Sequence, residues 1–361
     1  MHQRTARDHE GHYLPPRLRL LLISSLYPTP DRPDVGPFVE RRVADARARG
    51  TIVRVVAAPS YRGSVVIRYT RLAWAALTAR GTFDGVETHV LFPTGLIGLV
   101  AARLRSIPHV VYVHGSDVAV TSRRSRLHRW LTRVVARSAA RVVTNSEDTA
   151  GLARDLGVEP IVVSPGVDLA RFRPGDQGAA RKRTGLPADA RIALFCGRLI
   201  DVKGADTFAE AMDSAHGWLG VMVGVGDLAR TIEERHQAIR LVGSVPSAAV
   251  PEWLRSADVV VVPSRRESLG LVAIEALACG VPVVASRVGG LVETIDHGVT
   301  GLLIPPADPG AIVDALRTLE DDELRARLGA AAPASVERHS IAQSTEAMDA
   351  VWRALTSGGV R

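Results

Sequence analysis

The chain has 361 residues, of which 46% are hydrophobic and 23% charged, and its net charge is +7. This length predicts two domains, and the composition is typical of a soluble globular protein. Its apolar runs are too short to span a bilayer, and its two cysteines, Cys196 and Cys279, lie in apolar contexts, so the sequence excludes a membrane-spanning protein and a disulfide framework.

The positive charge is concentrated in the first half of the chain. Residues 1–180 contain 26 Arg and 15 acidic residues, whereas residues 181–361 contain 17 Arg, 2 Lys and 23 acidic residues. Such a basic half suggests an anionic partner: a nucleic acid, a membrane surface or a phosphorylated substrate. Because aromatic residues are only 4% and no zinc-finger or RNA-binding motif is present, we expect no nucleic-acid partner.

The chain begins with a polar segment, residues 1–17, which we expect to be a flexible tail. It lacks the apolar stretch of a signal peptide, so we predict a cytoplasmic protein. Short β-branched runs then alternate with amphipathic segments. In the first half the expected strands lie near residues 19–25, 52–58, 87–92, 109–115, 141–146 and 160–166; in the second half they lie near 191–197, 220–226, 239–244, 258–264, 281–286 and 301–306.

Near-continuous apolar strands that alternate with helices are typical of parallel sheets covered on both faces. Two such series predict an α/β fold with two doubly wound, Rossmann-like domains. We place the domains at residues 18–180 and 181–335, because the segment 168–190 is rich in Gly, Pro and charge. The last helix, within 336–361, either extends the second domain or crosses back to the first.

The loops of the second domain carry the candidate site. In open parallel sheets, ligands bind outside the carboxyl ends of the strands. The loop after residues 191–197 holds Arg198 and Lys203, one of only two lysines in the chain. Arg198 and Lys203 are either solvated loop residues or ligands for an anion.

The loop after residues 258–264 reads ESLGLVAIE and places Glu267 eight residues before Glu275. Gly270 permits close approach of a ligand to the backbone, and the amides of Leu271 and Val272 fall in the first turn of a helix. Amides at this positive end of a helix are donors for a phosphate group. Glu267 has a simpler alternative, because it follows two arginines with which it can pair.

The segment 263–295, PSRRESLGLVAIEALACGVPVVASRVGGLVETI, resembles the signature of the retaining glycosyltransferases of family 4, which have the GT-B fold. Its E-x7-E motif falls on Glu267 and Glu275, and GRLIDVKG at 197–204 resembles the family's donor-diphosphate loop. DVGPFVERRV and VYVHGSDV in the first half also resemble family segments. The resemblance implies a metal-independent transferase that uses a nucleoside-diphosphate sugar, with UDP or GDP favoured, and no cofactor.

The resemblance also implies a role for each site residue. Arg198 and Lys203 would stabilise the leaving diphosphate, in place of the metal that an Asp-x-Asp motif would hold. The other implied contacts are Glu267 and His114 with the donor sugar, Glu275 with the ribose, Val245 and Ser247 with the base, Gly36, Gly270, Leu271 and Val272 with the diphosphate, and Asp117 with the acceptor.

Three questions stay open at this point. The acceptor is a lipid-linked or envelope glycan, a polysaccharide, or a small soluble compound. A non-catalytic protein that binds a nucleotide sugar is the alternative to an enzyme. Finally, Arg129, Arg133, Arg137 and Arg141 recur every four residues, as on one helical stripe, which is either a solvated face or a contact for anionic lipid at the inner face of the membrane.

Overall fold

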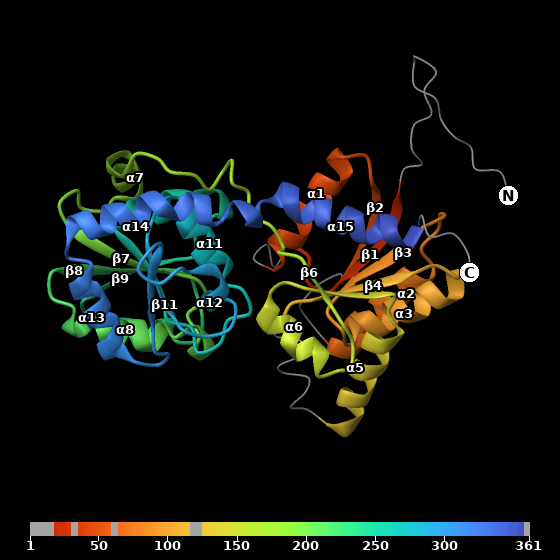
Figure 1. Ribbon diagram of the computed structural model, residues 1–361. Helices are drawn as coiled ribbons and strands as arrows, with labels where there is room; N and C mark the ends of the chain where they lie inside the picture. The colour runs from red at the N-terminus through yellow and green to blue at the C-terminus, as the bar shows by residue number, and fades with distance from the viewer. Residues whose placement is uncertain (1–17, 30–34, 59–63, 116–124, 357–361) are drawn as a thin grey trace, which may run out of the picture. The chain divides into compact units, whose positions relative to one another are not determined.

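The computed structural model describes residues 18–29, 35–58, 64–115 and 125–356, so the tail 1–17 lies outside the described residues. The chain divides into two compact units. The first contains residues up to Asn145, Ala150–Pro165 and the residues from Ser344 onward; the second contains Ser146–Thr149 and Gly166–Gln343. Each unit is an α/β unit around one six-stranded sheet (Figure 1), which confirms the predicted fold class.

The sheet of the first unit is parallel, with the strand order β2-β1-β3-β4-β5-β6. Its strands are β1 (Arg19–Ser24), β2 (Ile52–Ala57), β3 (Gly85–His89), β4 (His109–Val113), β5 (Arg141–Thr144) and β6 (Ile161–Val162). Its helices are α1 (Pro37–Ala48), α2 (Val65–Leu77), α3 (Thr94–Arg105), α5 (Arg126–Ser138), α6 (Glu147–Arg154) and α15 (Ile341–Thr356).

Alternation along these strands decides which helix covers which face. Leu21 and Ile23 of β1 point to the face that α2 and α3 cover, and Val111 of β4 points to α3 and α5. Leu20 of β1 and Tyr112 of β4 point to the opposite face, which α1 and α15 cover. Helices therefore lie on both faces, as the apolar strands predicted.

The sheet of the second unit is also parallel, with the order β12-β11-β10-β7-β8-β9. Its strands are β7 (Arg191–Cys196), β8 (Trp218–Val223), β9 (Ile239–Gly243), β10 (Val259–Val262), β11 (Val283–Ser286) and β12 (Gly301–Ile304). Its helices are α7 (Gln177–Thr184), α8 (Ala205–Ser214), α9 (Ala229–Arg235), α10 (Val250–Ser256), α11 (Leu271–Ala278), α12 (Leu291–Thr294), α13 (Pro309–Thr318) and α14 (Asp322–Ser335), with the short 3-10 turns Asp201–Lys203, Ser247–Ala249 and Glu337–His339.

The long continuous part of the second unit begins at Gly166, earlier than the boundary expected at residue 181. Phe172 is buried in the core of this unit with Leu186 and Trp253, so the polar segment before α7 belongs to it. The last helix groups with the first unit from Ser344, whose hydroxyl donates to the carbonyl of Ser164. Its Trp352 is buried against that unit's sheet.

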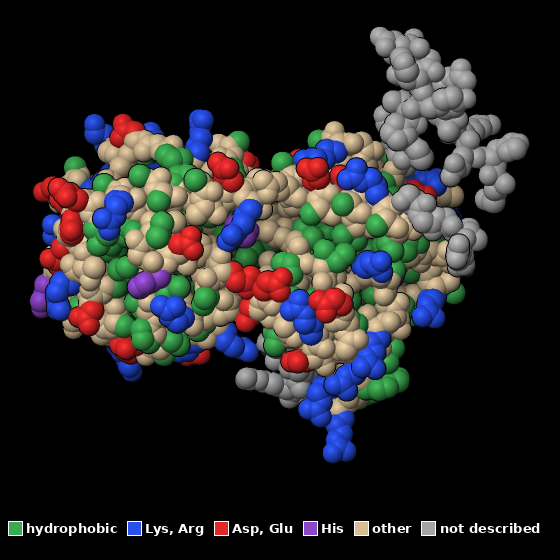
Figure 2. Space-filling model, in the orientation of Figure 1, with side chains coloured by type: hydrophobic (Ala, Val, Ile, Leu, Met, Phe, Trp, Pro, Cys, Tyr) green, Lys and Arg blue, Asp and Glu red, His purple; other side chains and the backbone are tan. Residues whose placement is uncertain are grey.

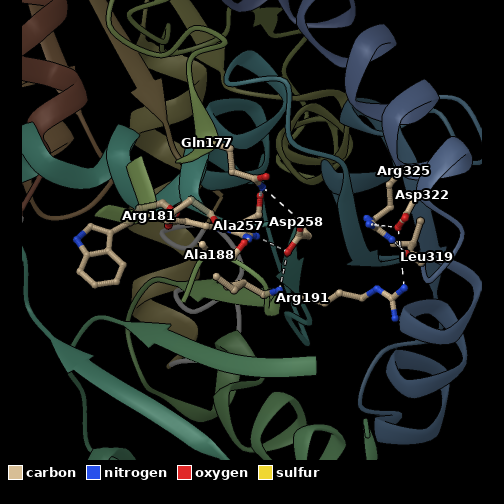
Figure 3. A network of polar contacts seen from close by, with 12 residues as sticks. Gln177, Arg181, Ala188, Arg191, Ala257, Asp258, Leu319, Asp322 and Arg325 are labelled. Carbon is tan, nitrogen blue, oxygen red and sulfur yellow. Dashed lines mark hydrogen bonds and ion pairs between the residues drawn. The ribbon is translucent and has the colours of Figure 1, made fainter. Parts of the chain in front are cut away.

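A polar network ties α7 to the amino ends of β7 and β10 (Figure 3). Asp258 accepts hydrogen bonds from Arg181 Nη2 at 2.7 Å and from the backbone amide of Ile192 at 2.6 Å. Arg181 also donates to the carbonyl oxygens of Ser256 and Ala188. These contacts fix the amino ends of β7 and β10. The candidate site lies at the other end of the strands, the carboxyl edge, where the loops are.

Candidate functional site

The candidate site lies where the order of strands in the second sheet reverses. β7 and β10 are neighbours in the sheet, but the chain proceeds from β7 toward β8 and from β10 toward β11. The loops after these two strands therefore leave in opposite directions, which opens a crevice at their carboxyl ends. Arg198 and Lys203 follow β7, and Glu267 and Gly270 follow β10.

The structure brings Lys203 and Glu267 into direct contact. Lys203 Nζ lies 2.5 Å from Glu267 Oε2, and the two side chains are 28% and 10% exposed. The hydroxyl of Ser264 donates to the same carboxylate oxygen at 3.3 Å. A partly buried ammonium in the loop after β7 is thus held by a carboxylate in the loop after β10.

A second ion pair locks the two loops together. Arg265 makes two hydrogen bonds of 2.7 Å to the carboxylate of Asp206 at the start of α8, and it also donates to the carbonyl of Asp201. Arg265, one of the two arginines that precede Glu267 and were considered as its partners, therefore pairs with Asp206 instead. Gly204 precedes α8 with a φ of 68°, and a Cβ there would overlap the carbonyl oxygen of Pro263, so the loops meet backbone to backbone.

Gly270 forms the N-cap of α11 with a φ of 83°, a backbone conformation that residues other than glycine rarely adopt. Its carbonyl accepts from Ala273, which leaves the amides of Leu271 and Val272 in the first turn without a partner within the helix. The carbonyl of Glu267 accepts from the amide of Gly290, so the loop after β11 fixes the backbone of this glutamate. The helix terminus and the Lys203–Glu267 pair share one loop.

Glu275 lies one helical turn further along α11 and is half-buried. Burial and then the charge of Glu275 raise the pKa of Cys196, at the end of β7, to about 12, so the thiol is neutral. Burial likewise raises the pKa of Cys279 to about 12. Both cysteines are free and largely enclosed.

The remaining predicted donor residues are more open. Arg198 is exposed in the loop after β7. Val245 packs against the core of the second unit, while Ser247 is exposed and its hydroxyl accepts from Arg171 at 3.1 Å. Within the described residues, no group of three or more His, Cys, Asp or Glu side chains is arranged to hold a metal ion.

In the first unit, the first turn of α1 lies beside His114. Gly36 caps α1, and a Cβ there would overlap the carbonyl of Leu26. The ring of Phe38, in the first turn of α1, lies 5.1 Å from the ring of His114. His114 follows β4 and is 8% exposed. Asp117, the predicted acceptor-side residue, lies outside the described residues.

Sequence reasoning missed a buried polar group beside His114. His89, at the end of β3, places Nδ1 2.9 Å from His114 Nε2. Arg42 forms an ion pair with Glu87, and both are buried. The indication in the sequence was ETH at 87–89, a strand buried along its whole length that carries a glutamate and a histidine two residues apart.

The predicted arginine stripe is only partly a helical feature. α5 ends at Ser138, because the chain turns at Ala139 to an extended conformation and continues into β5, which begins with Arg141. The prediction that Arg141 extends the stripe is wrong for this reason. Arg129, Arg133 and Arg137 are exposed on α5, and Arg137 also donates to the carbonyl oxygen of Leu156 at 3.0 Å.

Both halves of the chain match known families. Residues 176–335 match the family described as "Glycosyl transferases group 1", and residues 22–171 match "Glycosyltransferase Family 4". The chain is 33% identical to D-inositol 3-phosphate glycosyltransferase 1 of Catenulispora acidiphila over 319 residues, or 78% of this chain and 75% of the relative. It is 35% identical to the D-inositol 3-phosphate glycosyltransferase of Acidothermus cellulolyticus over 312 residues, 77% of this chain and 68% of the relative.

Solved structures share the fold. Sucrose-phosphate synthase from Thermosynechococcus elongatus superposes with a TM-score of 0.84 at 22% identity, covering 95% of this chain and all of that one. HepE from Anabaena in complex with UDP-glucose superposes with a TM-score of 0.76 at 18% identity, covering 94% of this chain and all of that one.

Proposed function

The chain belongs to glycosyltransferase family 4, and on this basis we propose that it transfers a sugar from a nucleoside-diphosphate donor to an acceptor hydroxyl with retention of the anomeric configuration. In such a step the bond from the anomeric carbon to the diphosphate breaks. The bond to the acceptor oxygen forms on the same face of the sugar, and the acceptor proton passes to the departing diphosphate.

The observation that carries the proposal is the Lys203–Glu267 pair beside the glycine-capped start of α11. Negative charge grows on the diphosphate as its bond to the sugar breaks. Lys203, the exposed Arg198 and the amides of Leu271 and Val272 are preorganised donors for that charge. In the structure Glu267 holds Lys203 in place. On donor binding, we expect Lys203 to turn to phosphate while Glu267 accepts from a sugar hydroxyl.

Glu275 suits the ribose of the donor. A half-buried carboxylate on an apolar helix needs donors, and a pair of ribose hydroxyls supplies two. UDP is the first nucleotide to test, because HepE, a protein of the same fold, was crystallised with UDP and with UDP-glucose.

We further propose that the acceptor is anionic. The relatives are named for an inositol phosphate, and the first half of this chain has the excess of arginine. A phosphorylated cyclitol and a phosphate-containing lipid share this chemistry. A transfer assay with inositol phosphate in one arm and a lipid phosphate in vesicles in the other separates the two sources.

The decisive test of the function has three readouts. Thermal shifts with UDP, GDP, ADP and dTDP identify the nucleotide, and release of that nucleotide from its sugar in the presence of acceptor measures transfer. Anomeric NMR of the product determines retention. A protein that binds the donor but never releases diphosphate with any acceptor is a non-catalytic binder, and that result would overturn the proposal.

Metal independence is a separate expectation. Because fixed cations and helix amides meet the leaving charge, excess EDTA should leave the rate of transfer unchanged. Activity that disappears in EDTA and returns with Mg²⁺ or Mn²⁺ would contradict this assignment.

We also propose that the first unit docks reversibly on an anionic bilayer through α2, α3 and α5. α3 contacts both other helices, and the three together carry eight arginines and no Asp or Glu. Their outer sides also expose apolar side chains, namely Val66, Ile67, Trp74, Leu104, Leu127 and Trp130. Figure 2 shows the blue arginine side chains along α5 with green apolar side chains beside them.

A surface that combines arginines with exposed tryptophans is typical of proteins that lie at the interface of a membrane. Among the described residues, no helix has the length and apolar character needed to cross a bilayer. Each arginine near an anionic leaflet contributes about 1 kcal/mol, and this attraction fades over about 8 Å at physiological salt.

Vesicle flotation tests the docking. We expect the protein to float with vesicles that contain phosphatidylglycerol at low salt, and to be released at high salt. The variant Arg129→Gln/Arg133→Gln/Trp130→Ser should float several-fold less, whereas the control Arg230→Gln/Arg317→Gln, which removes exposed arginines of the second unit, should float normally. No flotation at low salt, or equal loss in both variants, would overturn the docking.

A further inference from the structure

The loop after β8 supports the loop that carries Arg198. β8 lies beside β7 in the sheet, and the pairing of the two strands continues beyond their ends. The amide of Gly197 donates to the carbonyl oxygen of Val223 at 2.9 Å. The amide of Leu199, two residues further on, donates to the carbonyl oxygen of Val225, also at 2.9 Å. Bonds from alternate amides to alternate carbonyls are the pattern of a parallel ladder, so the backbone on either side of Arg198 is fixed.

Two glycines of the loop after β8 permit this close approach. A Cβ at Gly224 would overlap the carbonyl oxygen of Gly197, and a Cβ at Gly226 would overlap the carbonyl of Leu199. The same carbonyl of Leu199 accepts from the amide of Leu228 at 3.0 Å. Leu199 is therefore bonded to the loop after β8 through both its amide and its carbonyl, and a larger residue at position 226 would separate the two loops.

The alternation of side chains along this segment decides the direction of Arg198. Phe195 and Leu199 belong to the core that α8 and α13 cover, whereas Cys196 packs against the core that α11 covers. Because successive side chains of an extended chain point to opposite faces, Arg198 lies on the same face as Cys196. This is the face of α11, the helix whose first turn presents unpaired amides.

The backbone and the side chain of this segment differ in how firmly they are held. Leu199 is 1% exposed, so turning Arg198 to the other face would expose an apolar side chain and break both of its backbone hydrogen bonds. The guanidinium of Arg198 is exposed and, among the residues that the structure describes, has no hydrogen bond or ion pair. An unpaired guanidinium on a fixed backbone is preorganised to bind phosphate, because no partner has to be released first.

We propose that Gly224 and Gly226 are positioning residues, which together with the burial of Leu199 hold Arg198 on the α11 face before the donor binds. Arg198 then meets the diphosphate without a change of partner, whereas the paired Lys203 has to exchange one. The use of Arg198 by a diphosphate rests on the function proposed above. The placement of its backbone does not.

Hydrogen exchange of the full-length protein without added nucleotide tests the placement. In ¹H–¹⁵N NMR spectra, we expect the amides of Gly197 and Leu199 to exchange slowly, because both are hydrogen-bonded. The amide of Arg198, which donates to no group in the described part of the chain, should exchange faster. This measurement needs neither a variant nor activity. Equal exchange at all three amides would overturn the proposal.

Gly226→Ala tests the contact between the two loops. Gly226 does not have a positive φ, so alanine adds a Cβ against the backbone of Leu199 without straining its own backbone. We expect the amides of Gly197 and Leu199 to exchange at least about tenfold faster, and the affinity for UDP in calorimetric titration to fall about tenfold, which is the loss of one hydrogen bond to a charged group. Unchanged exchange in Gly226→Ala would contradict the positioning role.

Gly290→Ala is the matched control. Gly290 has a φ of −66°, and a Cβ there would overlap the carbonyl oxygen of Ser268, in the loop after β10. The variant therefore introduces the same kind of backbone contact into the other loop of the site, and the amides of Gly197 and Leu199 should exchange as in the parent. Equal acceleration of these two amides in both variants would indicate general loosening and would refute a specific support of Arg198.

A double-mutant cycle identifies Arg198 as the residue through which Gly226 acts. Gly226→Ala should weaken UDP binding in the parent and have no further effect in Arg198→Ala, whereas effects of independent origin would add. Additive losses would overturn the positioning role. An unchanged UDP affinity in Arg198→Ala would instead remove Arg198 from the proposed donor site, and the exchange pattern would still decide whether the loop after β8 positions it.

Discussion

Each unit contains a cation–glutamate pair, and the two pairs differ in burial. Arg42 and Glu87 in the first unit are 7% and 1% exposed, whereas Lys203 and Glu267 in the second unit are 28% and 10% exposed. In the first pair, His89 Nε2 lies 3.3 Å from Arg42 Nη2, and the indole of Trp352 donates to Glu87 Oε2 at 3.2 Å. The second pair borders loops whose backbones are fixed by glycine contacts.

This difference indicates different roles. A buried ion pair that loses one partner leaves an uncompensated charge in the interior, so the first pair is bound to the fold. A partly exposed pair gains little net stability from its attraction, so its members can exchange partners with a ligand at small cost. We infer that the Arg42–Glu87 pair of the first unit is a permanent part of its fold. The Lys203–Glu267 pair of the second unit can be separated by a bound diphosphate.

The largest expected effect comes from breaking the buried pair. Arg42→Met should lower the free energy of unfolding by about 3–5 kcal/mol, because Glu87 stays behind without its counter-charge. Urea denaturation followed by circular dichroism measures this. The control is Arg49→Met at the end of the same helix, where an exposed pair with Asp45 predicts a loss of about 1 kcal/mol or less. Equal losses would remove the distinction between the two kinds of pair.

Lys203→Ala should have the opposite effect to Arg42→Met: it should lower the rate of transfer and leave the free energy of unfolding nearly unchanged. We expect transfer to fall about a hundredfold, since a preorganised charge on the leaving group contributes about 3 kcal/mol. Lys203→Arg should restore little, because a planar fork does not replace a compact ammonium. Lys182→Ala, at the other lysine of the chain, is the control and should transfer normally in steady-state assays. Normal kinetics in Lys203→Ala would exclude it from the site.

Gly204→Ala tests whether the loop backbone supports Lys203. The added Cβ meets the carbonyl oxygen of Pro263 in a backbone with positive φ, so we expect about 1–3 kcal/mol of strain together with reduced transfer. Gly217→Ala is the comparison, because its φ is also positive but nothing lies within 4 Å of the new Cβ. We expect Gly204→Ala to unfold at a lower temperature and to transfer more slowly than Gly217→Ala. Equal melting temperatures and rates in the two variants would show that the contact with Pro263 is unimportant.

The smallest expected effect comes from the ion pair between the loops. Asp206→Asn removes the charge that faces Arg265 while keeping an oxygen acceptor. Because both side chains are about one third exposed, we expect a loss of at most about 1 kcal/mol in stability and a few-fold loss in kcat. Added salt should reduce the difference in unfolding free energy between Asp206→Asn and the parent protein. A salt-independent loss would indicate a packing effect instead.

Much of this protein is determined by its sequence alone. Apolar runs of about six residues that alternate with helical segments predicted two parallel doubly wound sheets, because strand and helix periodicities are local properties. The rule that ligands bind at the carboxyl ends of such strands then directed attention to the loops with Lys203, Glu267 and Gly270. Their types and spacing within each loop needed no tertiary information.

Tertiary structure decided which of these side chains meet. Lys203 and Glu267 are 64 residues apart, and Trp352 and Glu87 are 265 apart. Arg265 pairs with Asp206 and not with Glu267, two residues away in sequence. Arg141 is the first residue of β5 and lies outside the helix that carries the other predicted arginines. Such pairings depend on how sheets order their strands and on which polar groups are enclosed together. Since a buried charge is costly until a specific partner arrives, the partner is selected by the folded environment, which local sequence periodicity does not encode.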